Sequence, residues 1–428
     1  MYYVGQLKKK ALTCILLTLF LCTAWIPSAV SAEDGSSAVP AFVQTLDKLT
    51  LTPDQRKRLM ATPVWMQNQA VGMDQKEADA LVSFLQKPGR IKFATMAPLG
   101  TVWAKYIREI PKIFEKRSGG VIGVDAYIGL SLGNDPDYVR KMASGALETA
   151  GLTSWGMKYI SKEMGVYELP FLFESYGEAD YVMAKTWPYF VDKFKEKGFS
   201  LITINMEVGF LQIFSTTIMA KNPGDLAGTK YGSWMGPVEI ATMKKLGVNP
   251  VVITVAEVPS SLATNIIQTG SAMTMYMIGA QLMNFVQQGG GCSGINMFYP
   301  PGGLVYIKKN LENAALINLR KGDRKYLSKY VDSITEQLND IMNDAAPKLA
   351  KELRAGNKML LKNLQKKGMQ LYIPTMEERK VWKEATRPLW DELAGKQYSR
   401  EILDMILKCK KEYRDAHPEE FATYVWEP

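Results

Sequence analysis

The sequence is nearly devoid of histidine: His417 is the single one in 428 residues. It lies near the C-terminus beside Pro418, where we expect an exposed and chemically inert side chain. A histidine-based catalytic triad is therefore excluded, although lysine- or carboxylate-based catalysis is not. No GxSxG, Walker A or GxGxxG run stands in the context it requires. We expect no catalytic residues, and binding rather than turnover.

Metal-ligating patterns are also missing. No His, Cys and carboxylate cluster has the spacing of a metal site, so we expect neither a metal nor a cofactor. The chain has four cysteines, of which Cys14 and Cys22 lie in the N-terminal segment. Cys292 and Cys409 remain, and the sequence leaves open whether they pair in an oxidising compartment.

Long apolar runs are absent except at the N-terminus. Lys8–Lys10 precede the apolar run Ala11–Trp25, and Ser31-Ala32 follows it. This pattern is typical of a secretory signal peptide, residues 1–32, cleaved near Ala32. The alternative is an uncleaved anchor, but the run is shorter than the roughly 20 residues that a span needs. We therefore expect an exported chain that does not itself span a membrane.

The basic excess is mild. The formal net charge is +9, and the lysines and arginines are spread along the chain. No compact group of basic and aromatic residues accompanies them, so we expect no nucleic-acid partner.

Residues 33–89 predict short helices ahead of the main body. Thr52 to Gln55 is a capping box with Pro53 at the first helical position, and Asp74 to Glu77 is a second box. We expect two or three helices that dock on the rest of the protein, because so few residues do not fold alone. The alternative is that these helices bind a partner.

Two α/β units follow. Strands at 91–96, 121–128 and 147–152 alternate with helices in residues 90–213, which with the return segment 292–320 form lobe 1. Residues 214–291, with 347–400, form lobe 2. Its centre, Asn222–Gly270, reads strand, helix, strand, helix, with the last helix from about Glu257 to near Thr269. This order predicts parallel sheets, whose ligands bind at the carboxyl ends of the strands.

One amphipathic helix is long enough to touch both lobes. It covers residues 321–346, and we expect Pro347 to kink or restart it. Residues 401–428 form a C-terminal helix and a tail that is loose after about Glu412. The fold class is therefore α/β, with two lobes, hinge strands, a lobe-spanning helix and an N-terminal helical extension.

Several short motifs resemble those of one family when their order and spacing are taken together. The resemblance is to the periplasmic substrate-binding subunits of tripartite ATP-independent periplasmic (TRAP) transporters, of the DctP type, over roughly residues 90–400. The segments that carry it are Glu168–Phe173 (ELPFLF), Asn222–Gly228 (NPGDLAG) followed by Lys230, Lys245–Pro250 (KLGVNP), Glu257–Leu262 (EVPSSL), and Lys366–Met369 (KKGM) to Pro374.

This resemblance implies a two-lobed periplasmic binding protein of the type II kind. It also implies a periplasmic receptor that captures a small organic ligand between its lobes and delivers it to a membrane permease driven by an ion gradient. Three polar anchors implied by the family are replaced here. Gly232 and Leu211 stand where the family has arginines, and Gln268 stands where it has an aspartate. No arginine occurs between Arg140 and Arg320.

The cleft lining is therefore predicted from the positions of strand-to-helix loops. Aromatic and methionine walls with few polar groups suit a neutral or apolar ligand. Each residue is also a candidate for ordinary core. The expected ligand-binding residues are Ser131, Thr153, Ser154, Trp155, Phe171, Leu211, Gly232, Trp234, Met235, Gln268, Met275 and Tyr276.

Two other interpretations stay open. A carboxylate ligand held through a bound cation is one. A non-transport scaffold or sensor that docks a protein through the 33–89 helices is the other.

Overall fold

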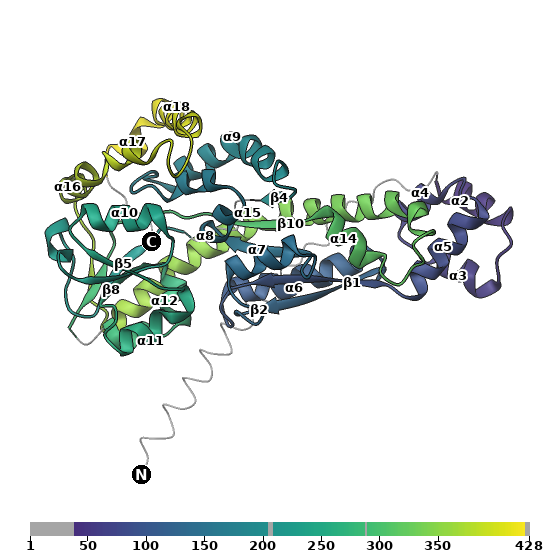
Figure 1. The fold of residues 1–428 in the computed structure, drawn as a ribbon, viewed down its shortest axis with the longest axis horizontal. Coiled ribbons are helices and arrows are strands. Elements are labelled where there is room, and N and C mark those ends of the chain that lie inside the picture. Colours follow the sequence, from purple (N-terminus) through teal and green to yellow (C-terminus); the bar gives the residue numbers. More distant parts are fainter. Residues whose placement is uncertain (1–37, 204–208, 287–288, 424–428) are drawn as a thin grey trace, which may run out of the picture.

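The computed structural model describes residues 38–203, 209–286 and 289–423, so the expected signal peptide lies outside the described residues. The chain forms two lobes, each built on one sheet, with a helical arm extending from the first (Figure 1). The first sheet has the order β2 (Ile122–Ile128), β1 (Gly89–Thr95), β3 (Thr149–Thr153), β10 (Gly302–Tyr306), β4 (Ser200–Thr203). The second has the order β11 (Leu371–Tyr372), β9 (Gly291–Ser293), β5 (Gln212–Ser215), β8 (Thr269–Ala272), β6 (Lys230–Ser233), β7 (Asn249–Val252).

Both sheets are mixed rather than purely parallel. Strands β1, β2 and β3 are parallel, as are β6, β7 and β8, which agrees with the predicted βα units. In contrast, β10 is antiparallel to β3 and β4, and β5 is antiparallel to β8 and β9. The expectation of parallel sheets is wrong for these two strands, because each enters its sheet from the other lobe and so runs in the opposite direction.

Helices cover both faces of each sheet. In lobe 1, α6 (Val102–Arg117) and α14 (Lys308–Ala315) lie on one face, and α7 (Asp135–Ala143), α8 (Ser154–Ile160) and α9 (Tyr176–Lys195) on the other. In lobe 2, α11 (Val258–Ala263), α12 (Thr274–Gly279) and α13 (Met283–Val286) lie opposite α10 (Pro237–Lys245). After β11, α16 (Met376–Thr386) and α17 (Leu389–Leu393) contact α10, whereas α18 (Arg400–Ala416) packs on α9. Short 3-10 turns are η1 (Lys162–Glu168), η2 (Pro223–Leu226), η3 (Val255–Glu257), η4 (Arg324–Tyr326) and η5 (Pro418–Phe421).

One helix, α15 (Ser328–Lys366), belongs to both lobes. Leu338 and Met342 are buried in the core that contains β1 and α6, whereas Leu361 and Leu364 are buried in the lobe 2 core. Of the two expected effects of Pro347, the restart is wrong, because the helix continues through this proline for a total of 39 residues, and the kink stays a prediction. Apolar contacts on both sides of the proline hold the helix together despite the missing N–H.

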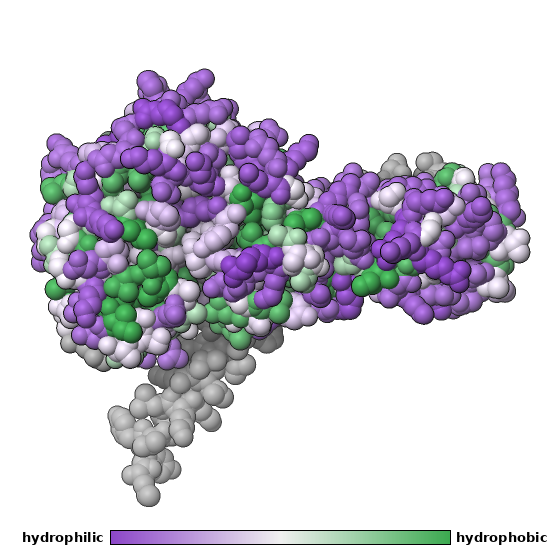
Figure 2. All heavy atoms as spheres, in the orientation of Figure 1, coloured by the Kyte–Doolittle hydropathy of each residue, from purple (hydrophilic) through white to green (hydrophobic). Residues whose placement is uncertain are grey.

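The described part of the N-terminal extension, residues 38–89, has four helices, where two or three were predicted: α2 (Ala38–Asp47), α3 (Pro53–Met60), α4 (Val64–Ala70) and α5 (Gln75–Gln86). The capping box at Thr52 and the Asp74 cap form as expected. These helices pack around η4 and the start of α15, and they form an arm that projects away from lobe 2 (Figure 1). The visible face of the arm is mostly hydrophilic (Figure 2). Inside it, Tyr330 of α15 donates a hydrogen bond to Glu77, with 2.8 Å between oxygens.

The C-terminal region is more ordered than its sequence suggests. Helix α18 continues to Ala416, past the point where we expected a loose tail. Its Cys409 lies in the lobe 1 core and Cys292 in the lobe 2 core, and both are free cysteines. The disulfide that the sequence left open therefore does not form. His417 is exposed and stacks on Tyr413, with 4.3 Å between ring centroids.

The arm shares a continuous apolar core with lobe 1, so we expect both to unfold together. Phe84 of α5 is 1% exposed within this core. Phe84→Ala should lower the free energy of unfolding by about 3–5 kcal/mol in one cooperative transition, as for other large-to-small core changes. Val71→Ala is the control, since Val71 is 42% exposed and should cost little. Urea unfolding followed by circular dichroism checks this. A separate early transition, alone affected by Phe84→Ala, would contradict it.

Candidate functional site

A cavity of about 110 Å³ lies between the two lobes. Its lobe 1 wall comes from the carboxyl ends of β1 and β3 and from the first turns of α6. Its lobe 2 wall comes from the segments that follow β6, β7 and β8. Thus the carboxyl ends of strands from both sheets meet at one place, where α/β proteins commonly bind ligands. The lining is Thr95–Pro98, Trp103, Ile107, Gly151–Thr153, Gly302 and Gly303 on lobe 1, and Trp234, Val255, Val258, Ser271–Met273 and Tyr276 on lobe 2.

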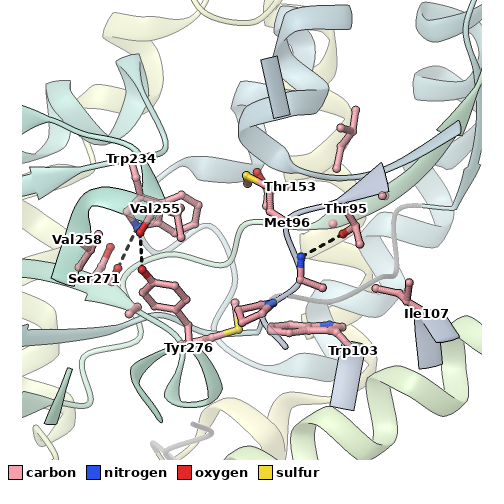
Figure 3. A pocket seen from close by; sticks show the side chains of 18 residues that line it. Thr95, Met96, Trp103, Ile107, Thr153, Trp234, Val255, Val258, Ser271 and Tyr276 are labelled. Atoms are coloured by element: carbon pink, nitrogen blue, oxygen red, sulfur yellow. Dashed lines mark hydrogen bonds between the residues drawn. The ribbon is translucent and has the colours of Figure 1, made fainter. Parts of the chain in front are cut away.

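The cavity wall carries no formal charge. Its 18 residues include no Arg, Lys, His, Asp or Glu (Figure 3). Trp234 and Tyr276 lie on the side of Val258, and Trp103 and Ile107 lie on the other side (Figure 3). The wall is therefore mostly aromatic and aliphatic, which suits an apolar ligand surface.

Two polar side chains of the wall, Trp234 and Tyr276, form hydrogen bonds within the protein. The indole Nε1 of Trp234 donates to the carbonyl of Ser271 at 3.0 Å, and the Tyr276 hydroxyl donates to the carbonyl of Val255 at 2.5 Å. Burial raises the pKa of Tyr276 well above its usual range, so its hydroxyl stays protonated. These two bonds fix the ring planes against the cavity.

A buried carboxylate shapes the lobe 2 wall from behind. Glu239, in the first turn of α10, accepts the backbone N–H groups of Trp234 and Met235, each at 2.9 Å. It also accepts the hydroxyls of Ser233 at 2.7 Å and Tyr231 at 2.9 Å. Burial raises the pKa of Glu239, and these hydrogen bonds oppose the rise. The carboxylate thereby holds the loop that presents Trp234, and it is not itself part of the wall.

Asp135 holds a loop of the lobe 1 wall, as Glu239 does in lobe 2. Its Oδ2 accepts the backbone N–H of Thr153 at 2.9 Å and the Thr153 hydroxyl at 2.5 Å. Asp135 is fully buried, which raises its pKa to about 7. Gly156 lies directly over it: a Cβ on this glycine would come within 2.6 Å of the Asp135 Cβ. A glycine is therefore required here for the close approach of α8 to α7.

Lys158 joins the lobes next to the cavity. From α8 of lobe 1, its ammonium contacts Glu168 and donates to the main-chain oxygen of Met235 in lobe 2. Glu168 is fully buried, and burial raises its pKa while Lys158 opposes the rise. The ion pair therefore needs both partners, because either charge left alone would be costly to bury.

The structure places three of the sequence-predicted residues in the cavity wall: Thr153, Trp234 and Tyr276. The remaining nine lie outside it. Ser131 is exposed in the loop after β2. Ser154 donates to Glu168 at 2.6 Å, and Trp155 packs edge-on against Tyr159. Met235 and Met275 are buried, the latter with its methyl group facing Gly356 of α15.

The other four belong to the core or to the far end of a strand. Phe171 and Leu211 are buried, and their N–H groups donate to the carbonyls of Met297 at 2.7 Å and Phe298 at 3.0 Å. Gly232 lies inside β6. Gln268 precedes β8, at the end opposite the cavity, and accepts the N–H of Lys230 at 3.3 Å. The sequence misplaced Gln268 because α11 ends at Ala263, six residues before the expected helix end.

Residues that the sequence did not single out form much of the wall. Trp103 and Ile107 share one face of α6. Met96 and Pro98 belong to the turn between β1 and that helix. The rule that ligands bind at carboxyl ends of strands, applied to this first turn of lobe 1, would have found them.

The chain matches the family model of bacterial extracellular solute-binding protein, family 7 (DctP), over residues 93–289 and 324–397. It is 25% identical over 316 residues to the C4-dicarboxylate-binding periplasmic protein DctP of Rhodobacter capsulatus, covering 73% of this chain and 89% of that protein. It is 24% identical over 156 residues to the 2,3-diketo-L-gulonate-binding periplasmic protein YiaO of Escherichia coli K12, covering 36% of this chain and 47% of that protein.

Solved structures share the fold. A TRAP periplasmic solute-binding protein from Ochrobactrum anthropi has a TM-score of 0.65 and 22% identity, covering 78% of this chain and 99% of that chain. The sugar acid binding protein DctPAm from Advenella mimigardefordensis, in complex with galactonate, has a TM-score of 0.65 and 20% identity, covering 76% of this chain and 99% of that chain.

The family match covers more than half of the chain, and the fold agrees with it. The chain belongs to the bacterial extracellular solute-binding protein family 7, the DctP-type receptors of TRAP transporters. Proteins of this family are periplasmic substrate-binding receptors. Within the described residues, no helix combines the length and hydrophobicity needed to cross a membrane.

The raised pKa of Asp135 predicts a pH-dependent stability. The ordinary pKa of an aspartate is about 3.9, so between that value and about 7 the native state holds a proton that the unfolded state has lost. The free energy of unfolding should therefore fall as pH rises through this window, by at most about 1.4 kcal/mol per pH unit. Asp135→Asn should remove this slope. Its stability relative to the unaltered chain should therefore be higher at pH 8 than at pH 5.

Asp137→Asn on the same helix is the matched control. The pKa of Asp137 is lowered, chiefly by the backbone hydrogen bond from Asn134, so its contribution has the opposite sign. Urea unfolding at pH 5 and pH 8 gives the free energy of unfolding of the unaltered chain, Asp135→Asn and Asp137→Asn, and so the pH slope of each. Equal pH slopes for the unaltered chain and Asp135→Asn would contradict the assignment.

Proposed function

We propose that this protein is a periplasmic TRAP-type receptor whose ligand is a small organic molecule without a net charge. The ligand sits between the two lobes, and the closed receptor delivers it to a membrane permease. The observation that carries this proposal is the uncharged lining of the interlobe cavity. We propose no catalytic activity for the chain.

The physical argument rests on desolvation. A carboxylate taken out of water needs an opposite charge or several hydrogen-bond donors, and its burial otherwise costs several kcal/mol. The cavity wall has no cationic side chain, and the Trp234 indole N–H and the Tyr276 phenol O–H already have partners. Relatives whose names specify a C4-dicarboxylate or a diketo-gulonate bind organic acids. The wall of this cavity supports a different ligand.

A carboxylate bridged by a cation is less well supported. Within the parts of the chain that the structure describes, no group of three or more His, Cys, Asp or Glu side chains could hold a metal ion. Two acidic groups behind the wall, Asp135 and Glu239, accept hydrogen bonds from the protein's own backbone, through Oδ2 in Asp135 and Oε2 in Glu239. No observation favours the scaffold interpretation over a receptor.

We expect native mass spectrometry of the protein, isolated gently from the periplasm, to show a retained uncharged molecule. Trp103→Ala should weaken binding of that molecule at least tenfold, because an aromatic wall residue contributes more than about 1.4 kcal/mol of apolar burial. Trp155→Ala, a tryptophan outside the cavity wall, should leave binding within about twofold and is the matched control. Titration calorimetry measures both variants. Micromolar binding of succinate by the unaltered protein would overturn the proposal.

An arginine introduced at Gly232 should not create a carboxylate site. A Cβ at this position would lie 2.7 Å from Cδ1 of Ile267 and 2.8 Å from Cδ1 of Ile253, so the position faces packed lobe 2 core. We expect Gly232→Arg to lose at least about 2 kcal/mol of stability through overpacking and a buried charge, without gaining succinate affinity. Gly322→Arg is the control, because no atom lies within 4 Å of a Cβ there. A stable Gly232→Arg variant that binds succinate would contradict this reading of the site.

A further inference from the structure

Two more cavities continue from the interlobe cavity into lobe 1. The second has a volume of about 40 Å³ and the third about 10 Å³. Ile107 lines both the interlobe cavity and the second one. Ile91, Phe114 and Leu338 line both the second and the third. The three cavities therefore form one row, separated only by side chains.

The row follows one strand and one helix. Thr95, Phe93 and Ile91 alternate along β1, so their side chains share the face of the sheet that α6 covers. On α6, Trp103, Ile107 and Phe114 lie on one face at helical spacing. At about 1.5 Å per residue, the path along α6 from residue 103 to residue 114 is about 16 Å long.

The inner two cavities are lined almost wholly by hydrocarbon. Their polar side chains are Thr149 and Thr335, whose hydroxyls donate to the carbonyls of Val305 at 2.8 Å and Val331 at 3.0 Å. Water gains no partners in such a space, so an apolar cavity of this kind stays dry or accepts an apolar guest. Close-packed interiors have few voids larger than a water molecule, and the second cavity adjoins the interlobe cavity at Ile107.

We infer that the ligand is an amphiphile with a single unbranched alkyl chain. This inference rests on the proposed receptor function and names the substrate class. The alkyl chain enters past Ile107 and lies between β1 and α6, directed toward α14. The uncharged polar end, such as a hydroxyl or an ester, stays in the interlobe cavity, where both lobes close on it. The path requires the side chains that separate the cavities, Ile107 between the first two and Ile91, Phe114 and Leu338 between the last two, to change rotamer.

The row of cavities predicts different affinities for an alkyl-chain ligand and for a compact one. A small aromatic or branched molecule would fill the interlobe cavity alone, and its affinity would be indifferent to the inner cavities. An unbranched chain gains about 0.8 kcal/mol for each buried CH₂ group, which is roughly a fourfold gain in affinity. The gain stops where the row ends at Leu311 and Ala315 of α14.

The test uses n-alkanols from butanol to dodecanol, with the matching n-alkanoates, on the delipidated full-length mature protein. We expect calorimetric affinity for the alkanols to rise about fourfold per CH₂ and then level off, with each alkanoate weaker than its alkanol at pH 7.5. Val124→Phe should fill the second cavity, because Val124 lines it from β2. This variant should lower affinity for dodecanol at least tenfold and leave butanol within twofold.

Val252→Phe is the matched control, since Val252 is 72% exposed on the other sheet and should leave the whole series unchanged. If Val124→Phe does not fold, the affinities of the unaltered protein for the alkanol series still test whether the ligand has an alkyl chain. Affinity that does not rise beyond butanol overturns the alkyl-chain inference. A compact retained ligand also overturns the alkyl-chain inference, but that result leaves the proposed receptor function intact. If alkanoates bind more tightly than alkanols, the inference that the polar end of the ligand is uncharged is overturned. Absence of both a retained ligand and any binding defeats the receptor function as well.

Discussion

The arrangement of the two lobes depends on a pair of chain segments that cross between them side by side. Residues 209–211 lead into β5, and residues 296–298 lead toward β10. They are tied by the hydrogen bond from Leu211 N–H to the Phe298 carbonyl and by one between the side chains of Gln212 and Asn296. Because each segment delivers one strand antiparallel to its new neighbours, each sheet is completed by chain that comes from the other lobe. The carboxyl ends of β1 and β3 consequently face those of β6 and β8, and the cavity is the space between them.

Two buried acidic residues lie one layer behind that cavity. Asp135 and Glu239 receive backbone N–H groups from the very loops that form the wall. These hydrogen bonds explain how the loops that carry the indole, phenol and aliphatic groups of the wall are held in place. The acidic groups near the cleft therefore serve loop geometry, and the residues that line the cavity include none with a charged side chain.

Local sequence signals predicted the elements well and the site less well. The capping box at Thr52 and the cap at Asp74 were predicted from residues that act within one helical turn, and both form. The restart expected at Pro347 does not occur, because tertiary packing on both sides of the proline outweighs its missing hydrogen bond. Gln268 was misplaced because Asn265, at a positive φ of 55°, ends the helix turn early and lets β8 begin.

The cavity wall was predicted in lobe 2 better than in lobe 1. Trp234 and Tyr276 follow strands directly, so their place was visible in the order of elements. Trp103 and Ile107 lie on a helix face whose residues read equally well as core. Only the relative position of the two lobes, set by segments far apart in the sequence, decides that this face borders a cavity. The pattern of a single helix cannot contain that information.

The length of α15 has a mechanical consequence. One continuous helix is buried in the lobe 1 core at Leu338 and Met342 and in the lobe 2 core at Leu361 and Leu364, with the arm packed on its beginning. Any rotation of one lobe against the other must therefore bend this helix or shift it within one of the two cores. Leu349 and Leu353, beyond Pro347, are buried in the same core as Leu338 and Met342, so the proline lies within the packed part of the helix. The helix therefore couples the position of lobe 2 to that of lobe 1 and the arm.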